Sequence, residues 1–132
     1  MPDFYSIVTR SGGQAIAAAI AAGTPLVLTH MAVGDGLMTP VEGMSALASE
    51  RWRGVCEVSR HPVEPGWVQA QVILPDDVGG WMVREVAVYA GEVLIAIGNY
   101  PDSYIPLMPG GARKTIDIKM VIEFSNATVI AP

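Results

Sequence analysis

The chain has 132 residues, of which 51% are hydrophobic and 16% are charged, and its net charge is −5. This length suits one domain with its own core, and the scattered basic residues argue against a nucleic-acid partner. The single cysteine, Cys56, excludes an internal disulfide. The longest apolar helical run, residues 15–22, is too short for membrane insertion. So few charges on an apolar chain indicate that another chain covers part of its surface.

The N-terminal part of the chain predicts an extended segment followed by a helix. Residues 3–9 are the extended segment, and Ser11 is the expected N-cap of an Ala-rich helix over residues 14–22. Gly23 ends that helix, and Pro25 prevents it from resuming. One helix face consists of small residues, which favours tight core packing, with a seam to a partner helix as the alternative: Ala15, Ala18, Ala19 and Ala22.

A strand, a turn and a second short helix are expected next. Residues 26–33 predict the strand, and His30 within it is expected to have a hydrogen-bond partner rather than to bind a ligand. Residues 45–52 predict the short helix, with Ser45 as its N-cap. The turn that closes the strand is rich in glycine: Gly34, Asp35 and Gly36.

Two later segments predict strands with one apolar face each. Residues 53–61 and 67–74, joined by a turn at 62–66, predict a hairpin. The apolar face of its second strand has four residues: Val68, Ala70, Val72 and Leu74. The final strand, over residues 115–124, alternates most regularly, with five residues expected to face inward: Ile116, Ile118, Met120, Ile122 and Phe124.

The central stretch, residues 79–106, predicts a β-hairpin, and we expect the other elements to be arranged around it. Two apolar runs, 81–89 and 93–98, are separated by three residues that include a glycine. Alternation places Met82, Arg84, Val86 and Val88 on one face, and Trp81, Val83, Glu85, Ala87 and Tyr89 on the other. Arg84 and Glu85 therefore point to opposite faces, and each charge needs its own partner. Residues 99–111 follow as a long loop of the kind that is usually functional.

These elements predict a single α+β domain over residues 1–132, mostly antiparallel sheet, with an N-terminal Ala-rich helix and a second short helix. Patterns for catalysis fail at specific residues: Arg113 stands where a phosphate loop needs glycine, and Leu47 where a nucleophile elbow needs it. We expect no enzyme, no cofactor and no metal site. Two alternatives stay open, namely a carbohydrate-binding module that uses residues 100–104, and a small hydrolase that brings His30 or His61 against a carboxylate.

Six motifs occur in order along the chain: FYSIVTRSGGQAIAAAIAAG from residue 4, MAVGDG from 31, ALASERWR from 46, GGWMVREVAVY from 79, LIAIGNYPDSYIP from 94 and SNA from 125. Together they resemble the N-terminal domain of phage tail-collar fibre proteins from P2-like contractile tails. The sequence departs from the family pattern at Ile105, between Tyr104 and Pro106, where a lysine is expected.

The resemblance implies a non-enzymatic domain at the proximal end of a longer fibre. It implies that this domain fastens a homotrimeric fibre to the tail baseplate, so that the partners are a baseplate protein and sister chains. The location would be the virion tail, after assembly in the bacterial host cytoplasm. Our hypothesis is that a sheet carrying residues 81–89 and 113–124 is a rigid scaffold, and that ten residues bind the partners: Gly34, Asp35, Gly36, Trp81, Arg84, Glu85, Asn99, Tyr100, Tyr104 and Pro106.

Overall fold

Strands dominate the computed structural model, which describes residues 6–37, 39–60, 66–75, 77–107, 116–123 and 130–131. In these residues the chain forms helix α1 (Arg10–Ala22) and ten strands. The strands are β1 (Ser6–Val8), β2 (Leu26–Val27), β3 (His30–Gly34), β4 (Glu50–Val55), β5 (Glu57–Arg60), β6 (Trp67–Leu74), β7 (Trp81–Ala90), β8 (Val93–Ile105), β9 (Ile116–Glu123) and β10 (Ile130–Ala131).

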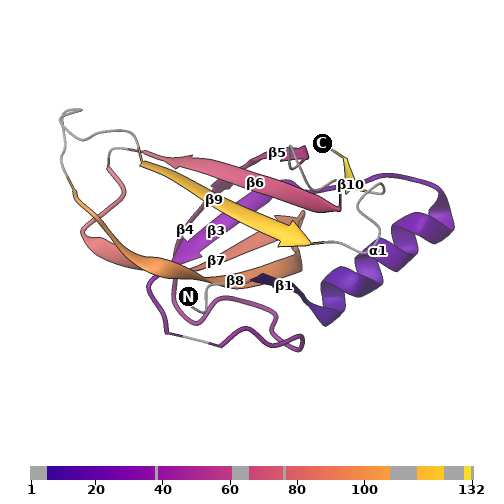
Figure 1. Cartoon of the computed structure of the whole chain (residues 1–132), viewed down its shortest axis with the longest axis horizontal. Coiled ribbons are helices and arrows are strands. Elements are labelled where there is room, and N and C mark those ends of the chain that lie inside the picture. The colour runs from indigo at the N-terminus through magenta and orange to yellow at the C-terminus, as the bar shows by residue number, and fades with distance from the viewer. Residues whose placement is uncertain are drawn as a thin grey trace.

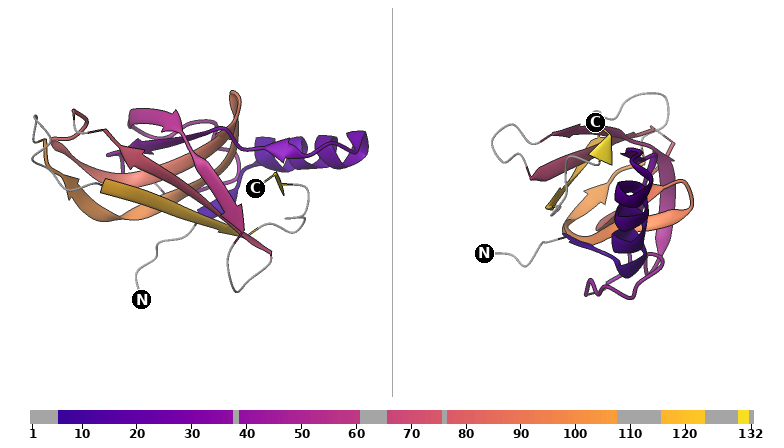
Figure 2. Two further views of the ribbon diagram at one scale, coloured as in Figure 1. Left: turned by 90° about the horizontal axis from the view of Figure 1, so that it is seen from above. Right: turned by 90° about the vertical axis from the view of Figure 1, so that its right-hand side faces the viewer.

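Two antiparallel sheets enclose the main core (Figure 1). The first has five strands in the order β1-β8-β7-β3-β4, and the second has three in the order β5-β6-β9. The chain passes from the first sheet to the second at Cys56, between β4 and β5. On the other side β1 lies beside β9, and Ser6 Oγ donates a hydrogen bond of 2.6 Å to the Val121 carbonyl. Helix α1 projects from one end of the sheets, beside the short parallel pair β2–β10 (Figure 2).

The predicted α+β class is wrong, because the fold is mostly β and the described residues contain α1 as their single helix. Residues 45–52 do not form the second helix. Instead, β4 begins at Glu50 and pairs with β3, and the preceding residues form an irregular loop. Pairing with β3 outweighs the local helical pattern, since tertiary context overrides weak propensity.

The alternating strands bury the faces that the sequence predicts. In β6 the buried residues are Val68, Ala70, Val72 and Leu74, and in β9 they are Ile118, Met120 and Ile122. Ile116 is half-buried, and Phe124 lies outside the described residues. The predicted hairpin is confirmed for residues 57–60, which form β5 and pair with β6. The first part of the predicted strand 53–61 is wrong, because residues 53–55 belong to β4 in the first sheet, and residues 61–65 lie outside the described residues. Each fully buried aliphatic side chain contributes about 1.5–3 kcal/mol relative to exposure.

Helix α1 starts earlier than predicted and ends where predicted. Its N-cap is Thr9, not Ser11, because the Thr9 Oγ1 accepts a hydrogen bond of 3.0 Å from the Gly12 N–H. Ser11 Oγ instead donates to the Leu94 carbonyl at 2.7 Å. At the other end Gly23 has φ 67°, and its N–H bonds the carbonyls of the last turn. This left-handed C-cap confirms the role predicted for Gly23.

The N-cap assignment predicts different costs for two neighbouring substitutions. Thr9→Ala removes a buried hydroxyl that both caps α1 and donates to the Leu94 carbonyl at 2.7 Å. We expect it to lower the free energy of unfolding by about 1–2 kcal/mol. Ser11→Ala removes one partly buried bond and should cost less than half as much. Urea denaturation of both variants measures the difference, and equal losses would contradict Thr9 as the cap.

The central hairpin is present and longer than predicted. Gly91, with φ 63°, lies in the turn between β7 and β8, as the sequence suggested. The expected loop at 99–111 is wrong in its first half, because β8 continues to Ile105. Residues 108–111 lie outside the described residues. The segment 26–33 is divided into β2 and β3, while residues 6–8 of the expected extended segment form β1.

A bulge interrupts the pairing of β7 with β8. Val83 pairs with Ser103 and Glu85 pairs with Asn99, so three residues of β8 oppose Arg84 alone. Such a bulge accommodates Pro101, whose missing N–H would disrupt regular pairing. It also breaks the predicted alternation, since Val83 joins Val86 in the main core rather than sharing a face with Ala87 and Tyr89.

Candidate functional site

Glu85 is the most unusual side chain in the described residues, because it is a fully buried carboxylate with 0% exposure. Its Oε2 accepts hydrogen bonds from the backbone N–H groups of Gly36 at 2.9 Å and Ser49 at 2.7 Å. Its Oε1 accepts a third from the N–H of Ala48 at 2.8 Å. These charge-assisted bonds offset the cost of burying the carboxylate. Glu85 therefore ties the loop after β3 to the loop before β4.

The glycines of the predicted turn make room for this carboxylate. A Cβ added at Gly34 would lie 2.5 Å from Glu85 Oε2, and one at Gly36 would lie 2.7 Å from the same atom. Side chains therefore do not fit at either position while Glu85 keeps its bonds. Three of the ten predicted residues are thus brought together, but inside the domain. We name this arrangement of Glu85 with the two loops the carboxylate clamp.

Charged side chains lie at the surface beside the clamp. Arg84 Nη1 donates to the Asp35 carbonyl at 3.2 Å, and Arg84 Nε lies 3.7 Å from Asp102 Oδ1. Among the described residues Arg84 Nε has no hydrogen-bond partner, although the atom is buried. The Asp35 carboxylate lies 3.7 Å from Arg51 Nε. A hydrogen bond from the Ser49 side chain, together with the charges of Arg51 and Arg84, lowers the pKa of Asp35.

Aromatic side chains continue this surface at the start of β7. Trp81 pairs with Ile105 and is half-buried against the main core, with the Arg51 guanidinium 5.7 Å from its ring centroid. Tyr104, one residue before Ile105, is 60% exposed. Pro106 follows directly and is half-buried. We call the surface formed by Asp35, Arg51, Trp81, Arg84 and Asp102, which are joined by the contacts above, the clamped corner. Tyr104 lies close to it in the sheet, paired with Met82.

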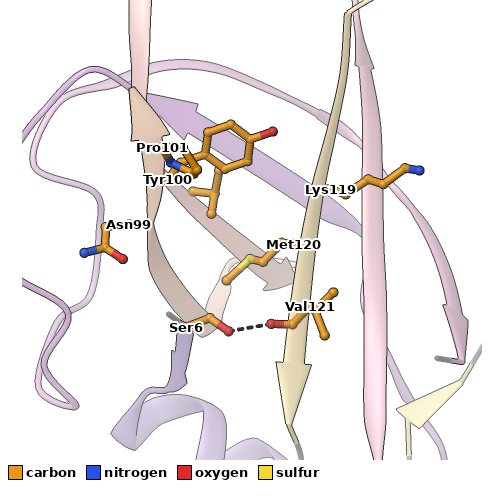
Figure 3. A pocket seen from close by; sticks show the side chains of 8 residues that line it. Ser6, Asn99, Tyr100, Pro101, Lys119, Met120 and Val121 are labelled. Atoms are coloured by element: carbon orange, nitrogen blue, oxygen red, sulfur yellow. Dashed lines mark hydrogen bonds between the residues drawn. The ribbon is translucent and has the colours of Figure 1, made fainter. Parts of the chain in front are cut away.

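Asn99 and Tyr100 lie elsewhere, in a cleft between β8, β9 and β1 (Figure 3). The cleft has a volume of about 190 Å³, and Ser6 and Lys119 also line it. Tyr100 is half-buried against the main core, and burial, followed by the charge of Asp117, raises its pKa. Its ring is therefore largely committed to packing. Of the two tyrosines proposed for sugar stacking, Tyr104 is the exposed one.

Sequence reasoning missed the partners of Arg84 and Glu85. Asp102 lies three residues beyond Asn99 in a segment expected to be a loop, and Arg51 lies in the segment expected to be a helix. The donors to Glu85 are backbone groups 36 to 49 residues away along the chain. No side-chain pattern marks such donors. The one signal in the sequence was that Arg84 and Glu85 are charged residues in an otherwise apolar strand, so that each needs a partner.

The structure tests the prediction for one of the two histidines. His30 Nδ1 lies 2.8 Å from Thr29 Oγ1, which gives it the expected hydrogen-bond partner, and His61 lies outside the described residues. Among the residues that the structure covers, no three His, Cys, Asp or Glu side chains gather where they could hold a metal ion. In the same residues, no helix has the length and apolarity to cross a membrane.

A buried carboxylate that fixes two loops beside a charged and aromatic surface defines a structural β domain with a preformed surface. The family model of the phage tail-collar fibre protein N-terminal region matches residues 1–131. The chain belongs to this family, which confirms the resemblance seen in the six motifs. It is therefore a structural protein of a phage tail fibre and a component of the virion tail.

One curated relative extends the comparison. The chain is 34% identical over 134 residues to the "Probable tail fiber protein" of Escherichia phage P2. The alignment covers 96% of this chain and 20% of the P2 protein, so the chain spans about a fifth of that relative's length. No solved structure matches the chain.

Proposed function

We propose that residues 1–132 are the proximal attachment domain of a longer, homotrimeric tail fibre, and that the clamped corner docks on a baseplate protein of a contractile tail. The observation that carries this proposal is the carboxylate clamp. Because Glu85 holds both loops, the corner is ordered before any partner arrives. Preorganisation of this kind lowers the entropic cost of binding, which suits permanent attachment.

The ten predicted residues divide into three roles in this proposal. Asp35, Trp81, Arg84, Tyr104 and Pro106 meet the baseplate protein directly. Gly34, Gly36 and Glu85 do not contact the partner; they fix the conformation of the two loops that form the corner. Asn99 and Tyr100 line the cleft next to β9 and form a second, peripheral contact.

Among the residues of the clamped corner, Arg84 has the most incomplete set of hydrogen bonds. Its Nε is buried without a hydrogen bond among the described residues, and its ion pair with Asp102 is long, at 3.7 Å. Arginine and tryptophan are enriched among residues that dominate binding energy at interfaces. The proposal therefore assigns Arg84 and Trp81 the centre of the docking contact, with Asp102 and Tyr104 at its rim.

Arg84→Ala is expected to weaken binding of the 132-residue chain to tail particles assembled without fibres by about 10- to 100-fold. The melting temperature should change little, since the Arg84 ion pair is partly exposed and worth less than about 1 kcal/mol. The chain carries a fluorophore, and binding is measured by cosedimentation with the particles.

The matched control for this experiment is Arg10→Ala. It also removes one exposed arginine, but it lies at the start of α1, at the opposite end of β8 from the clamped corner. Normal binding by Arg84→Ala with normal melting removes Arg84 from the docking surface. Oligosaccharide-dependent NMR shifts at Tyr104, without binding to fibreless tails, would instead establish the carbohydrate-binding alternative.

A further inference from the structure

The outward face of α1 has a composition that is unusual for a helix in water. The residues of α1 that are buried against the sheets are Gly12, Ile16 and Ala19. The others reach solvent in this chain, and eight of them are exposed: Arg10, Gly13, Gln14, Ala17, Ala18, Ile20, Ala21 and Ala22. The predicted tight packing therefore uses Ala19 and the half-buried Ala15, and it leaves Ala18 and Ala22 uncovered.

Charge on this face is confined to Arg10, in the first turn of α1. The sequence from residue 11 to residue 34 contains no Asp, Glu, Lys or Arg. Ile20 at 50% and Val27 at 54% are exposed apolar side chains within this stretch. A helix with one buried face normally has charged and polar residues on the opposite face. Here Arg10 and Gln14 are the polar side chains among the eight exposed residues, and both lie near the N-terminal end of α1.

We infer that the outward face of α1 packs against α1 of a second copy of this chain. At 3.6 residues per turn, Gly13, Ala17 and Ala21 form one row along the helix, with Ile20 beside it. Small residues in such a row let two helices approach at the lower end of the usual interaxial range of about 8–10 Å. From Gly13 to Ala22 the face carries no charge, so like-charge repulsion between two identical faces is confined to Arg10 at one end.

The position of α1 in the fold suits contact between copies. Strand β10 pairs with β2, directly after α1, so any sequence that follows residue 131 in the full-length protein leaves the domain beside α1. The P2 relative is about five times as long as this chain, since the alignment covers 20% of it. Copies that continue side by side as a fibre would thus first meet at α1.

The helix and the clamped corner lie at opposite ends of β8. Thr9, the N-cap of α1, bonds the carbonyls of Leu94 and Ile95 near the start of β8, whereas Trp81 pairs with Ile105 at its end. Contact between helices therefore leaves the corner free. The inference does not depend on docking at the baseplate, and the two proposals can fail separately.

Cysteine cross-linking of the 132-residue chain tests the contact. Ala17→Cys places a thiol at the centre of the outward face, while the native Cys56 is buried. Mild oxidation at about 10 µM protein should link two Ala17→Cys chains, and wild-type chains should stay unlinked. The control is Ile73→Cys, a 57% exposed position on β6 in the other sheet. Linking of both variants at the same rate, or of neither, overturns the inference.

Light scattering coupled to size exclusion gives an independent measurement. Wild-type chain should have the mass of an oligomer, whereas Ala17→Glu should have the mass of one chain, with dissociation favoured by about 100-fold or more. Position 17 is exposed, so circular dichroism should show an unchanged fold. A wild-type monomer at about 100 µM overturns the inference. Arg84→Ala should stay oligomeric, which separates this contact from docking at the corner.

Discussion

Glu85→Ala is expected to destabilise the domain by about 3–5 kcal/mol and to lower its melting temperature by about 10–20 °C. The substitution leaves the N–H groups of Gly36, Ala48 and Ser49 without their acceptor. Each buried unsatisfied donor costs about 1–3 kcal/mol, and part of the sum is recovered because the charge no longer has to be buried. Urea denaturation measures the loss, and amide exchange should accelerate first at these three residues.

Glu85→Gln is the matched control, because it keeps the shape of the side chain and removes its charge. Its single carbonyl oxygen can replace Oε2, which accepts from Gly36 and Ser49, but its NH2 group then faces the Ala48 N–H. We expect a loss between those of wild type and Glu85→Ala. A stability of Glu85→Ala within about 0.5 kcal/mol of wild type would contradict the clamp, since surface substitutions have effects of that size.

Two adjacent glycines in α1 are expected to respond to alanine with opposite signs. Gly12→Ala should destabilise the domain by about 2–3 kcal/mol, because its Cβ would overlap the Ile95 carbonyl of β8. In a chain kept monomeric, Gly13→Ala should stabilise the domain by about 0.5–1 kcal/mol, because a Cβ there meets nothing within 4 Å of the same chain and alanine favours the helix. Thermal denaturation of the two variants gives both signs.

These two variants control for each other, since both replace a glycine by alanine within the first turn of the same helix. Helix propensity alone predicts that both variants gain stability. A gain for Gly12→Ala would therefore mean that α1 lies farther from β8 than the structure places it. A loss for Gly13→Ala would mean that position 13 is covered, which bears on packing between helices.

Patterns within single elements predicted most of the strands and their buried faces. Alternation in residues 67–74 and 116–123 predicted these two strands and their buried faces, because one face of each strand is apolar and the other is polar. The expectation that the last strand shares a sheet with residues 81–89 is wrong, since β9 pairs with β6 in the second sheet. Gly23 and Gly91 were predicted from their neighbours, and both adopt positive φ. These features are local, so the sequence near each residue contains the relevant information.

Features that depend on distant pairing were predicted poorly. The segment at residues 45–52 has a local helical pattern, but pairing with β3 turns its end into β4. Pro101 suggested a loop, yet a bulge opposite Arg84 lets β8 continue through it. The same bulge moved Val83 to the core face. Bulges depend on the partner strand, so alternation within one strand does not reveal them.

The sequence predicted that two charged residues of the candidate site need partners, but it did not predict which groups those partners are. Arg84 and Glu85 were expected to need separate partners, and the structure gives each its own. That Glu85 would bind backbone donors rather than another chain was not predicted. Its role as a partner-binding residue, like that of the other nine residues, stays a prediction.

The orientation of β8 has a mechanical consequence for a domain in a fibre. Its thirteen residues run from the α1 end to the clamped corner, and its ladder bonds to β7 lie across that direction. Tension between the two ends therefore loads those bonds in shear, so that many must break together instead of opening one after another. Resistance to such a pull is set by the rate of forced unfolding rather than by equilibrium stability. If the proposed attachment at the clamped corner and the proposed contact at α1 both hold, a pull on the fibre acts along this strand.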